Sequence, residues 1–153
     1  MTNSQKNKYS AEEVAKYFIY LASRENKENF REGITNLKLQ KILYFAQVYY
    51  LVKFDKPIFG EEIKAWKLGP VIPEAYCEFK ENGCDSIVRK EDCSNIKEED
   101  KEILKKVWNK FGIYTASKLV DIVHSHKPWK EAGKNEEITH DRIKEYYKPL
   151  FGE

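Results

Sequence analysis

The sequence predicts a mainly α-helical protein, a single compact domain of five to six helices with a small antiparallel β element around residues 57–67. Apolar residues recur at helical spacing along most of the chain, between capping residues and terminating glycines or prolines. Only one segment shows the alternation typical of a strand. The 153 residues contain no repeat, linker or low-complexity segment, which favours one domain with its own core.

The N-terminal part predicts a flexible segment followed by a helix. Residues 1–9 are polar, and we expect them to be a flexible N-terminus before a domain at 10–153. Ser10 and Glu13 form the pattern of a capping box, which predicts that the first helix begins here. A charged stretch then interrupts the pattern, and Thr35 or Asn36 is expected to cap the second helix.

The second helix, at residues 36–52, has apolar residues on two opposite faces. One stripe consists of Leu39, Ile42, Leu43, Ala46, Tyr49 and Tyr50, and the other of Leu37, Tyr44, Val48 and Leu51. The first stripe is expected to face the helical core. The second is expected to pack under the β element and hold the turn near Trp66, or alternatively to contact a partner.

The β element is predicted from the alternation of Ile63 and Ala65 with polar neighbours. This pattern predicts a short strand, or a hairpin with residues 57–59, before a turn. Pro73 suits the first position of a following helix, which Gly83 is expected to end.

Further helices are expected in the C-terminal half. Ser94 or Asn95 is predicted to cap a helix that ends at Gly112, and Thr115 to begin the next one. A short helical turn is expected at Pro128. Thr139 is predicted to cap a last helix that stops before Pro149.

The composition restricts the classes of partner. The 27 basic and 25 acidic residues nearly cancel, which excludes a strongly basic binder of nucleic acid. The weak excess of lysine between residues 37 and 67 is also typical of the solvent-facing edges of a core helix. No apolar run approaches the roughly 20 residues of a membrane span. A polar N-terminus and an odd number of cysteines favour a cytoplasmic protein with reduced thiols and no membrane partner.

The candidate chemical groups do not form a recognisable site. The cysteines and histidines lack the spacing of zinc ligands, and they are Cys77, Cys84, Cys93, His124, His126 and His140. A triad of Cys77, His124 and Asp121 is conceivable, but nothing in the sequence brings Cys77 near the other two. No glycine-rich loop is present. We therefore expect no catalytic residues, no metal and no cofactor.

Trp66 is the strongest candidate for a binding residue. If Ile63 and Ala65 face the core, strand alternation places Trp66 on the other face, as an interface anchor. The expected partner-binding surface comprises Trp66, Lys67, Gly69 and Pro70, with Lys64 beside them and Lys38 and Lys41 on the polar edge of the second helix. The alternative is a tryptophan covered by a neighbouring helix.

Two motifs resemble a known family. They are T-N-L-K-L-Q-K-x-L-Y-F-A-Q at residues 35–47 and A-W-x-x-G-P-V-x-P-E at residues 65–74. Together with the stretches around them, over residues 10–147, they resemble the Panacea antitoxin domain of phage-associated and toxin–antitoxin-operon proteins. The chain departs from the family pattern at Leu68, where an aromatic residue is usual, and at residues 48–50, where a small residue usually follows the A-Q.

The resemblance implies a non-enzymatic antitoxin that neutralises a toxin from a neighbouring gene by direct protein–protein binding. It gives no identity for the toxin, because families of this kind pair one domain with unrelated toxins, and it carries over no catalytic residues. Two alternatives remain open: an adaptor that delivers a bound protein to a protease, and a phage accessory protein that binds a host target.

Overall fold

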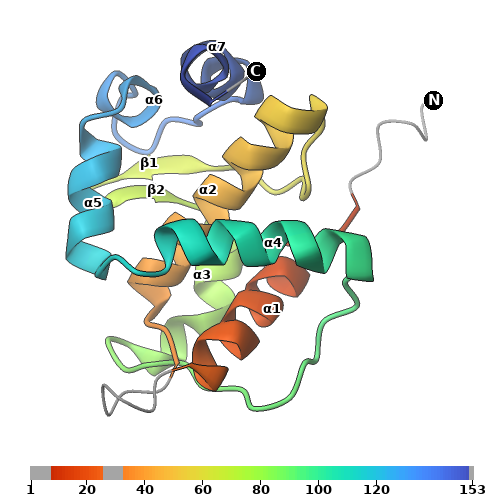
Figure 1. Ribbon diagram of the computed structural model, residues 1–153. Coiled ribbons are helices and arrows are strands. Elements are labelled where there is room, and N and C mark those ends of the chain that lie inside the picture. The colour runs from red at the N-terminus through yellow and green to blue at the C-terminus, as the bar shows by residue number, and fades with distance from the viewer. Residues whose placement is uncertain (1–7, 26–32, 152–153) are drawn as a thin grey trace.

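The computed structural model describes residues 8–25 and 33–151, and this part of the chain forms seven α-helices and one two-stranded sheet (Figure 1). The elements are α1 (Ala11–Arg24), α2 (Asn36–Phe54), β1 (Lys64–Trp66), β2 (Gly69–Val71), α3 (Pro73–Phe79), a 3-10 turn (Lys80–Asn82), α4 (Glu98–Phe111), α5 (Ala116–His124), α6 (Lys127–Lys130) and α7 (His140–Phe151). The predicted fold class is confirmed. The helix beyond the expected number is α6, where the sequence predicts only a short turn.

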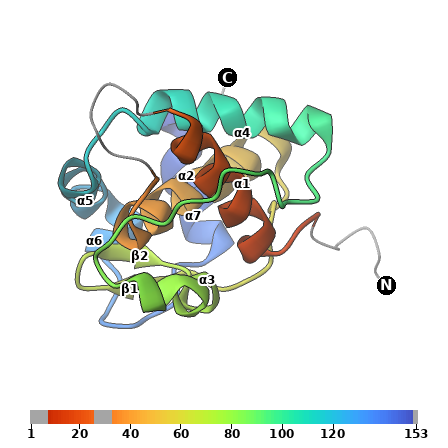
Figure 2. The ribbon, with the colours of Figure 1, turned by 90° about the horizontal axis from the view of Figure 1, so that it is seen from below.

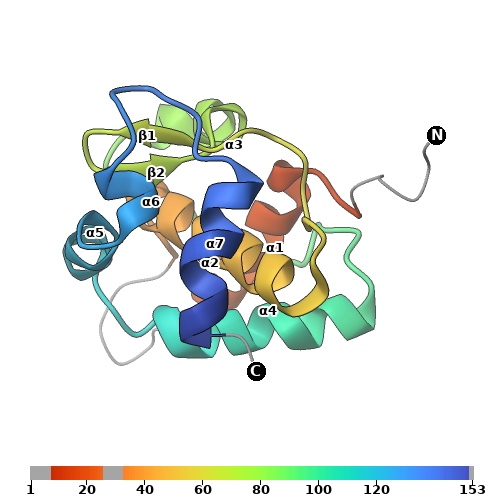
Figure 3. The same ribbon diagram turned by 90° about the horizontal axis from the view of Figure 1, so that it is seen from above.

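The helix α2 is the central element, and the rest of the domain surrounds it. It contacts α1, α3, α4, α5, α7 and β2. From above, α7 crosses over α2, with the hairpin and α3 on one side and α4 on the other (Figure 3). From below, α1 lies in front of α2 (Figure 2). Because neighbours pack on every side, both apolar stripes of α2 are buried, except that Leu37 and Tyr49 are only partly buried.

The second stripe of α2 packs differently from the expectation. Tyr44 lies against α7, where its hydroxyl forms a 3.1 Å hydrogen bond with that of Tyr147. Leu37 alone of that stripe lines a cleft shared with the hairpin. The surface of α2 beneath β2 is instead polar, because Gln40 and Lys41 bond to the backbone there.

The predicted helix starts are confirmed for α1, α2 and α5. Ser10 and Glu13 form both hydrogen bonds of the capping box, and Thr35 and Thr115 each cap a helix with their side-chain oxygens. Tyr9, at the end of the segment expected to be flexible, is fixed by two hydrogen bonds: its amide donates to the carbonyl of Ile58 and its hydroxyl to Asp100. Residues 1–7 of the expected flexible segment lie outside the described residues, so that boundary stays a prediction.

The partner strand of the β element is a correction to the sequence-based prediction. The strand at residues 64–66 pairs with Gly69–Val71, in the register Lys64↔Val71, Ala65↔Pro70 and Trp66↔Gly69, and not with residues 57–59. The segment 57–59 leads instead to a bridge between Phe59 and Tyr9. A proline in the partner strand obscured the pairing, because Pro70 has no amide to donate to a ladder.

Two helix ends also differ from the prediction. Lys97 occupies the N-cap of α4, because Ser94 bonds to Asp92 and Asn95 to Glu13. The helix α7 continues through Pro149 to Phe151, which stacks on Tyr147 with ring centroids 5.4 Å apart. Within the described residues, no helix is long and apolar enough to cross a membrane.

Candidate partner-binding surface

The polar residues near the start of α2 fasten neighbouring backbone. Gln40 accepts a 2.9 Å hydrogen bond from the amide of Ile72 and donates to the side chain of Asn36. Asn36 in turn donates to the carbonyl of Tyr76. Gln40 and Asn36 are buried, so these bonds satisfy polar groups that water cannot reach. They fix the chain from β2 into α3 against α2.

Lys41 lies under the hairpin, and its expected place on a polar edge is wrong. The side chain is fully buried, and its ammonium donates a 3.0 Å hydrogen bond to the carbonyl of Pro70. Burial lowers the pKa of Lys41 to about 7. Gly69 adopts φ +114°, and a Cβ there would lie 2.8 Å from Cε of Lys41. Gly69 and Pro70 are buried too, so they support the surface from beneath.

The outer edge of β1 is covered by the segment that follows α6. The amide of Ala65 donates to the carbonyl of Glu136, and the carbonyl of Ala65 accepts from Asn135. The amide of Ile138 donates to Ile63, which continues the pairing. The strand is therefore bonded on both sides, which holds the hairpin rigidly although it has only three residues in each strand.

The hairpin turn is anchored by two side chains from α5 and α6. The indole of Trp129 donates a 2.8 Å hydrogen bond to the carbonyl of Trp66. Nε2 of His124 lies 3.1 Å from the carbonyl of Lys67, which can only accept, so this nitrogen carries the proton. The rings of His124 and Trp129 stack with centroids 3.9 Å apart. Both residues therefore have positioning contacts to the backbone of the turn.

Trp66 is half-buried, so it is neither a fully exposed interface anchor nor a tryptophan fully covered by a neighbouring helix, the two alternatives that the sequence left open. Its ring packs edge-to-face on Tyr76 of α3, with centroids 5.3 Å apart, and its indole N–H donates to Asn135. Beside it lies a mainly apolar cleft of about 550 Å³, whose lining includes Leu37, Trp66, Leu68 and Tyr76. We call this the hairpin cleft. Leu68 is 48% exposed at its mouth.

The other lysines predicted for this surface are dispersed. Lys67 is exposed and, among the residues that the structure describes, is the one charged residue that lines the hairpin cleft. Lys64 pairs with Glu62 at 3.6 Å. Lys38 donates a 2.6 Å hydrogen bond to the carbonyl of Gly112, and burial lowers its pKa. The structure thus brings Trp66 and Lys67 together at the cleft and leaves Lys38 and Lys64 engaged elsewhere.

The candidate chemical groups stay apart or are engaged in structural contacts. Cys77, Cys84 and Cys93 are free and exposed. His126 contacts the hydroxyl of Tyr147, and burial lowers the pKa of this histidine. In the two described stretches of chain, no three His, Cys, Asp or Glu side chains are grouped to hold a metal ion.

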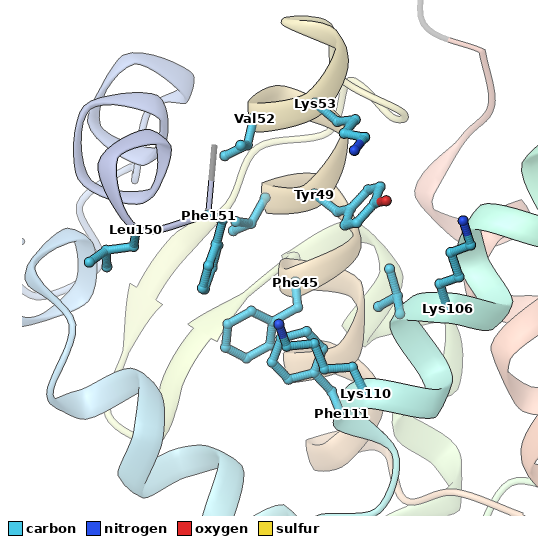
Figure 4. Close-up of a pocket in the computed structure, with 11 residues that line it drawn as sticks. Phe45, Tyr49, Val52, Lys53, Lys106, Lys110, Phe111, Leu150 and Phe151 are labelled. Atoms are coloured by element: carbon cyan, nitrogen blue, oxygen red, sulfur yellow. The ribbon is translucent and has the colours of Figure 1, made fainter. Parts of the chain in front are cut away.

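A second hollow, between α2, α4 and α7, was missed by the sequence-based prediction (Figure 4). We call it the lysine groove. Its floor includes Phe45, Val52, Phe111 and Phe151, and its rim carries Lys53, Lys106 and Lys110. It was missed because the last helix was expected to stop before Pro149, which left Leu150 and Phe151 without a place. The signal was present, since two large apolar residues directly follow that proline.

Comparisons with known proteins agree with the sequence motifs. The family described as Antitoxin SocA-like, Panacea domain, matches residues 39–130, a segment that contains the hairpin and both of its anchors, His124 and Trp129. Antitoxin SocA of Caulobacter vibrioides (strain NA1000 / CB15N) is 36% identical over an alignment of 109 residues, which covers 63% of this chain. The match spans 58% of that relative's own length. No solved structure matches the chain.

Proposed function

The chain belongs to the family described as Antitoxin SocA-like, Panacea domain, and from that membership we propose that it is an antitoxin that neutralises a toxin by binding it. The toxin is a protein encoded by a neighbouring gene, and the chain acts without catalysis. The family match over residues 39–130 carries this proposal. The name of the relative, Antitoxin SocA, supports it.

The hairpin cleft is the proposed contact surface. Apart from Thr35, Asn36 and Leu37, its lining residues lie within the family match. Among the described residues, the lining includes a half-buried tryptophan, an exposed leucine and a single lysine. Binding surfaces draw most of their free energy from a few such large side chains on a rigid support. Here Lys41, His124 and Trp129 supply the support through their bonds to the hairpin backbone.

The proposed mechanism is occlusion, in which the hairpin covers the active site or the substrate-binding face of the toxin. Trp66, Lys67 and Leu68 make the contact, while Gly69, Pro70 and Lys41 maintain its shape. Loss of an aromatic anchor at an interface costs on the order of 2–4 kcal/mol of binding free energy. Trp66→Ala is therefore expected to raise the dissociation constant of the toxin complex by at least tens-fold, which is the fold-change that corresponds to this loss of free energy.

Co-expression with the neighbouring gene tests the proposal. The neighbour is expressed alone and together with this protein, growth is scored, and a tag on this protein is used for co-purification. Growth arrest that this protein reverses, with a stable complex of the two, is the expected result. A harmless neighbour that does not co-purify would contradict the proposal. Rescue by disappearance of the toxin, without a stable complex, would contradict occlusion and support the delivery of toxin to a protease.

Variants of the hairpin cleft test the location. Because Trp66 also packs on Tyr76, its replacement is paired with Leu68→Glu, which changes an exposed side chain. Ile113→Glu is the matched control, since Ile113 is 76% exposed and does not line the cleft. Both cleft variants should lose binding and rescue while the control keeps them. Equal loss in the control would place the contact elsewhere.

A further inference from the structure

We propose that the lysine groove is a second binding site, for an acidic segment of a partner protein that inserts a bulky apolar side chain between α2, α4 and α7. The groove lies away from the hairpin cleft and shares no lining residue with it. Three observations carry the proposal: an open apolar floor, a rim of one charge sign, and the absence of internal partners for that charge within the described residues.

The floor of the groove is apolar and open. Phe45 of α2 and Phe111 of α4 stack with ring centroids 4.1 Å apart, and Phe151 from the end of α7 forms another wall (Figure 4). Leu150 is 58% and Phe151 40% exposed. The hollow has a volume of about 340 Å³, at the small end of ligand-sized sites and enough for one large side chain. Exposed apolar side chains gathered in a concave site indicate a partner.

The rim carries only positive charge. Lys53 comes from α2, and Lys106 and Lys110 come from α4 (Figure 4). No acidic residue of the described part of the chain lines the groove. On α4, Glu98, Glu99 and Asp100 lie in the first turn, at the far end of the helix, and Glu102, one turn before Lys106, does not line the groove. The electrostatic field at the groove therefore favours carboxylates or another anion.

Two of the three rim lysines, Lys53 and Lys110, contact aromatic rings instead of carboxylates. Lys110 lies 5.2 Å from the ring centroid of Phe151 and 5.8 Å from that of Phe111, and Lys53 lies 6.0 Å from that of Tyr49. Within residues 8–25 and 33–151, none of the three rim lysines forms an ion pair. On a neighbouring face, Lys144 and Lys148 both pair with Asp55. The three rim lysines thus keep their charge unpaired within the described residues, whereas Asp55 neutralises part of the charge of Lys144 and Lys148.

An acidic polypeptide fits these features better than nucleic acid. Phe45 is buried and covers one face of Phe111, so this stacked pair offers little ring surface to a base. The net charge of the chain is only +2, and the rim offers three lysines, too few for a long phosphate backbone. In a peptide with carboxylates around one Leu or Phe, the carboxylates would pair with the lysines of the rim and the apolar side chain would pack on the floor.

Binding of fluorescent peptides to the full chain, measured by anisotropy, tests the proposal. The probe is a short peptide of Glu and Asp around Leu and Phe. One control peptide replaces Leu and Phe with Ser, and another replaces the acids with Lys. The probe should bind in a salt-sensitive manner while both control peptides bind at least about tenfold more weakly. Backbone amide shifts in nitrogen–proton NMR spectra should map to the end of α2, the end of α4 and α7.

Exposed lysines of α4 and α5 supply matched variants. Lys106→Glu with Lys110→Glu reverses the rim and should weaken probe binding by about tenfold or more. Lys105→Glu with Lys118→Glu makes the same change in net charge at exposed positions outside the groove, and should alter binding by less than about threefold. Equal weakening in both pairs, no probe binding, or equal binding of the serine peptide would overturn the proposal. Tighter binding of single-stranded oligonucleotide, lost in the same rim variant, would also overturn it.

Discussion

The two ends of α2 carry opposite arrangements of polar and apolar side chains. At the N-terminal end, Gln40 and Lys41 are buried and bond to backbone of the segment from β2 into α3. At the C-terminal end, Val52 lines an open groove, and the lysine beside it, Lys53, is exposed. One helix therefore holds a rigid hairpin at its start and presents an apolar hollow at its end.

This difference indicates which side chains of α2 hold the fold together and which can be replaced without unfolding it. A buried polar group that loses its partner costs about 1–3 kcal/mol, whereas an exposed lysine contributes little to folding. The hairpin end is thus expected to tolerate little change beneath its surface. The groove end is expected to tolerate substitution of its rim, because the rim is not needed to hold the fold.

The largest expected effect comes from breaking the hairpin end at Gln40. Gln40→Leu keeps the side-chain volume but leaves the amide of Ile72 and the side chain of Asn36 without their partner. Unfolding in urea should show a loss of about 3 kcal/mol in the free energy of unfolding. Asn109→Leu, at an exposed site on α4, is the control and should change it by less than about 0.5 kcal/mol. If Gln40→Leu left the free energy of unfolding unchanged, the hydrogen bond to Ile72 would not be what holds the hairpin.

A smaller effect is expected from Lys41 and appears as pH dependence. Its pKa is lowered to about 7 in the folded protein, from 10.5 in the unfolded chain. Between these values the unfolded chain binds the extra proton, so raising the pH stabilises the fold. From about pH 7 to about pH 9 the gain should be about 2 kcal/mol, relative to Lys41→Met, in which that contribution is absent. Chemical denaturation at both pH values measures it, and parallel changes in the two proteins would refute the assignment to Lys41.

The smallest effect is expected at the groove end. Lys110→Met removes an ammonium that contacts the rings of Phe111 and Phe151 and forms no ion pair within the described residues, so the free energy of unfolding should change by less than about 0.5 kcal/mol. Thermal and urea unfolding together measure this change. A loss above about 1 kcal/mol would mean that the rim lysines stabilise the fold, and the contrast between the two ends of α2 would fail.

Local signals in the sequence predicted much of the fold. Ser10 with Glu13, Thr35 and Thr115 mark helix starts that the structure confirms, because capping depends on residues a few positions apart. The pairing partner of β1 was not predictable in this way. Pro70 lacks the amide that a strand normally contributes, and the other edge of β1 is covered by residues 135–138, distant in sequence.

The candidate site was predictable only in part. Trp66 was identified from strand alternation, and the structure places it at the hairpin cleft. The burial of Lys41 was not foreseen, because a helical wheel does not show that the carbonyl of Pro70 lies above it. The lysine groove was missed because Phe151 reaches it from the end of the chain, after a proline that was expected to stop the helix.

The most direct test of the account is the dissociation constant of the complex between this protein and the product of the neighbouring gene, measured for Leu68→Glu and Ile113→Glu side by side. Both variants place a carboxylate at an exposed apolar position, and only Leu68 lines the hairpin cleft. The account predicts weakening by at least about tenfold for Leu68→Glu and none for Ile113→Glu. Unchanged binding in Leu68→Glu, or equal loss in both variants, would contradict the assignment of the hairpin cleft as the toxin-binding surface.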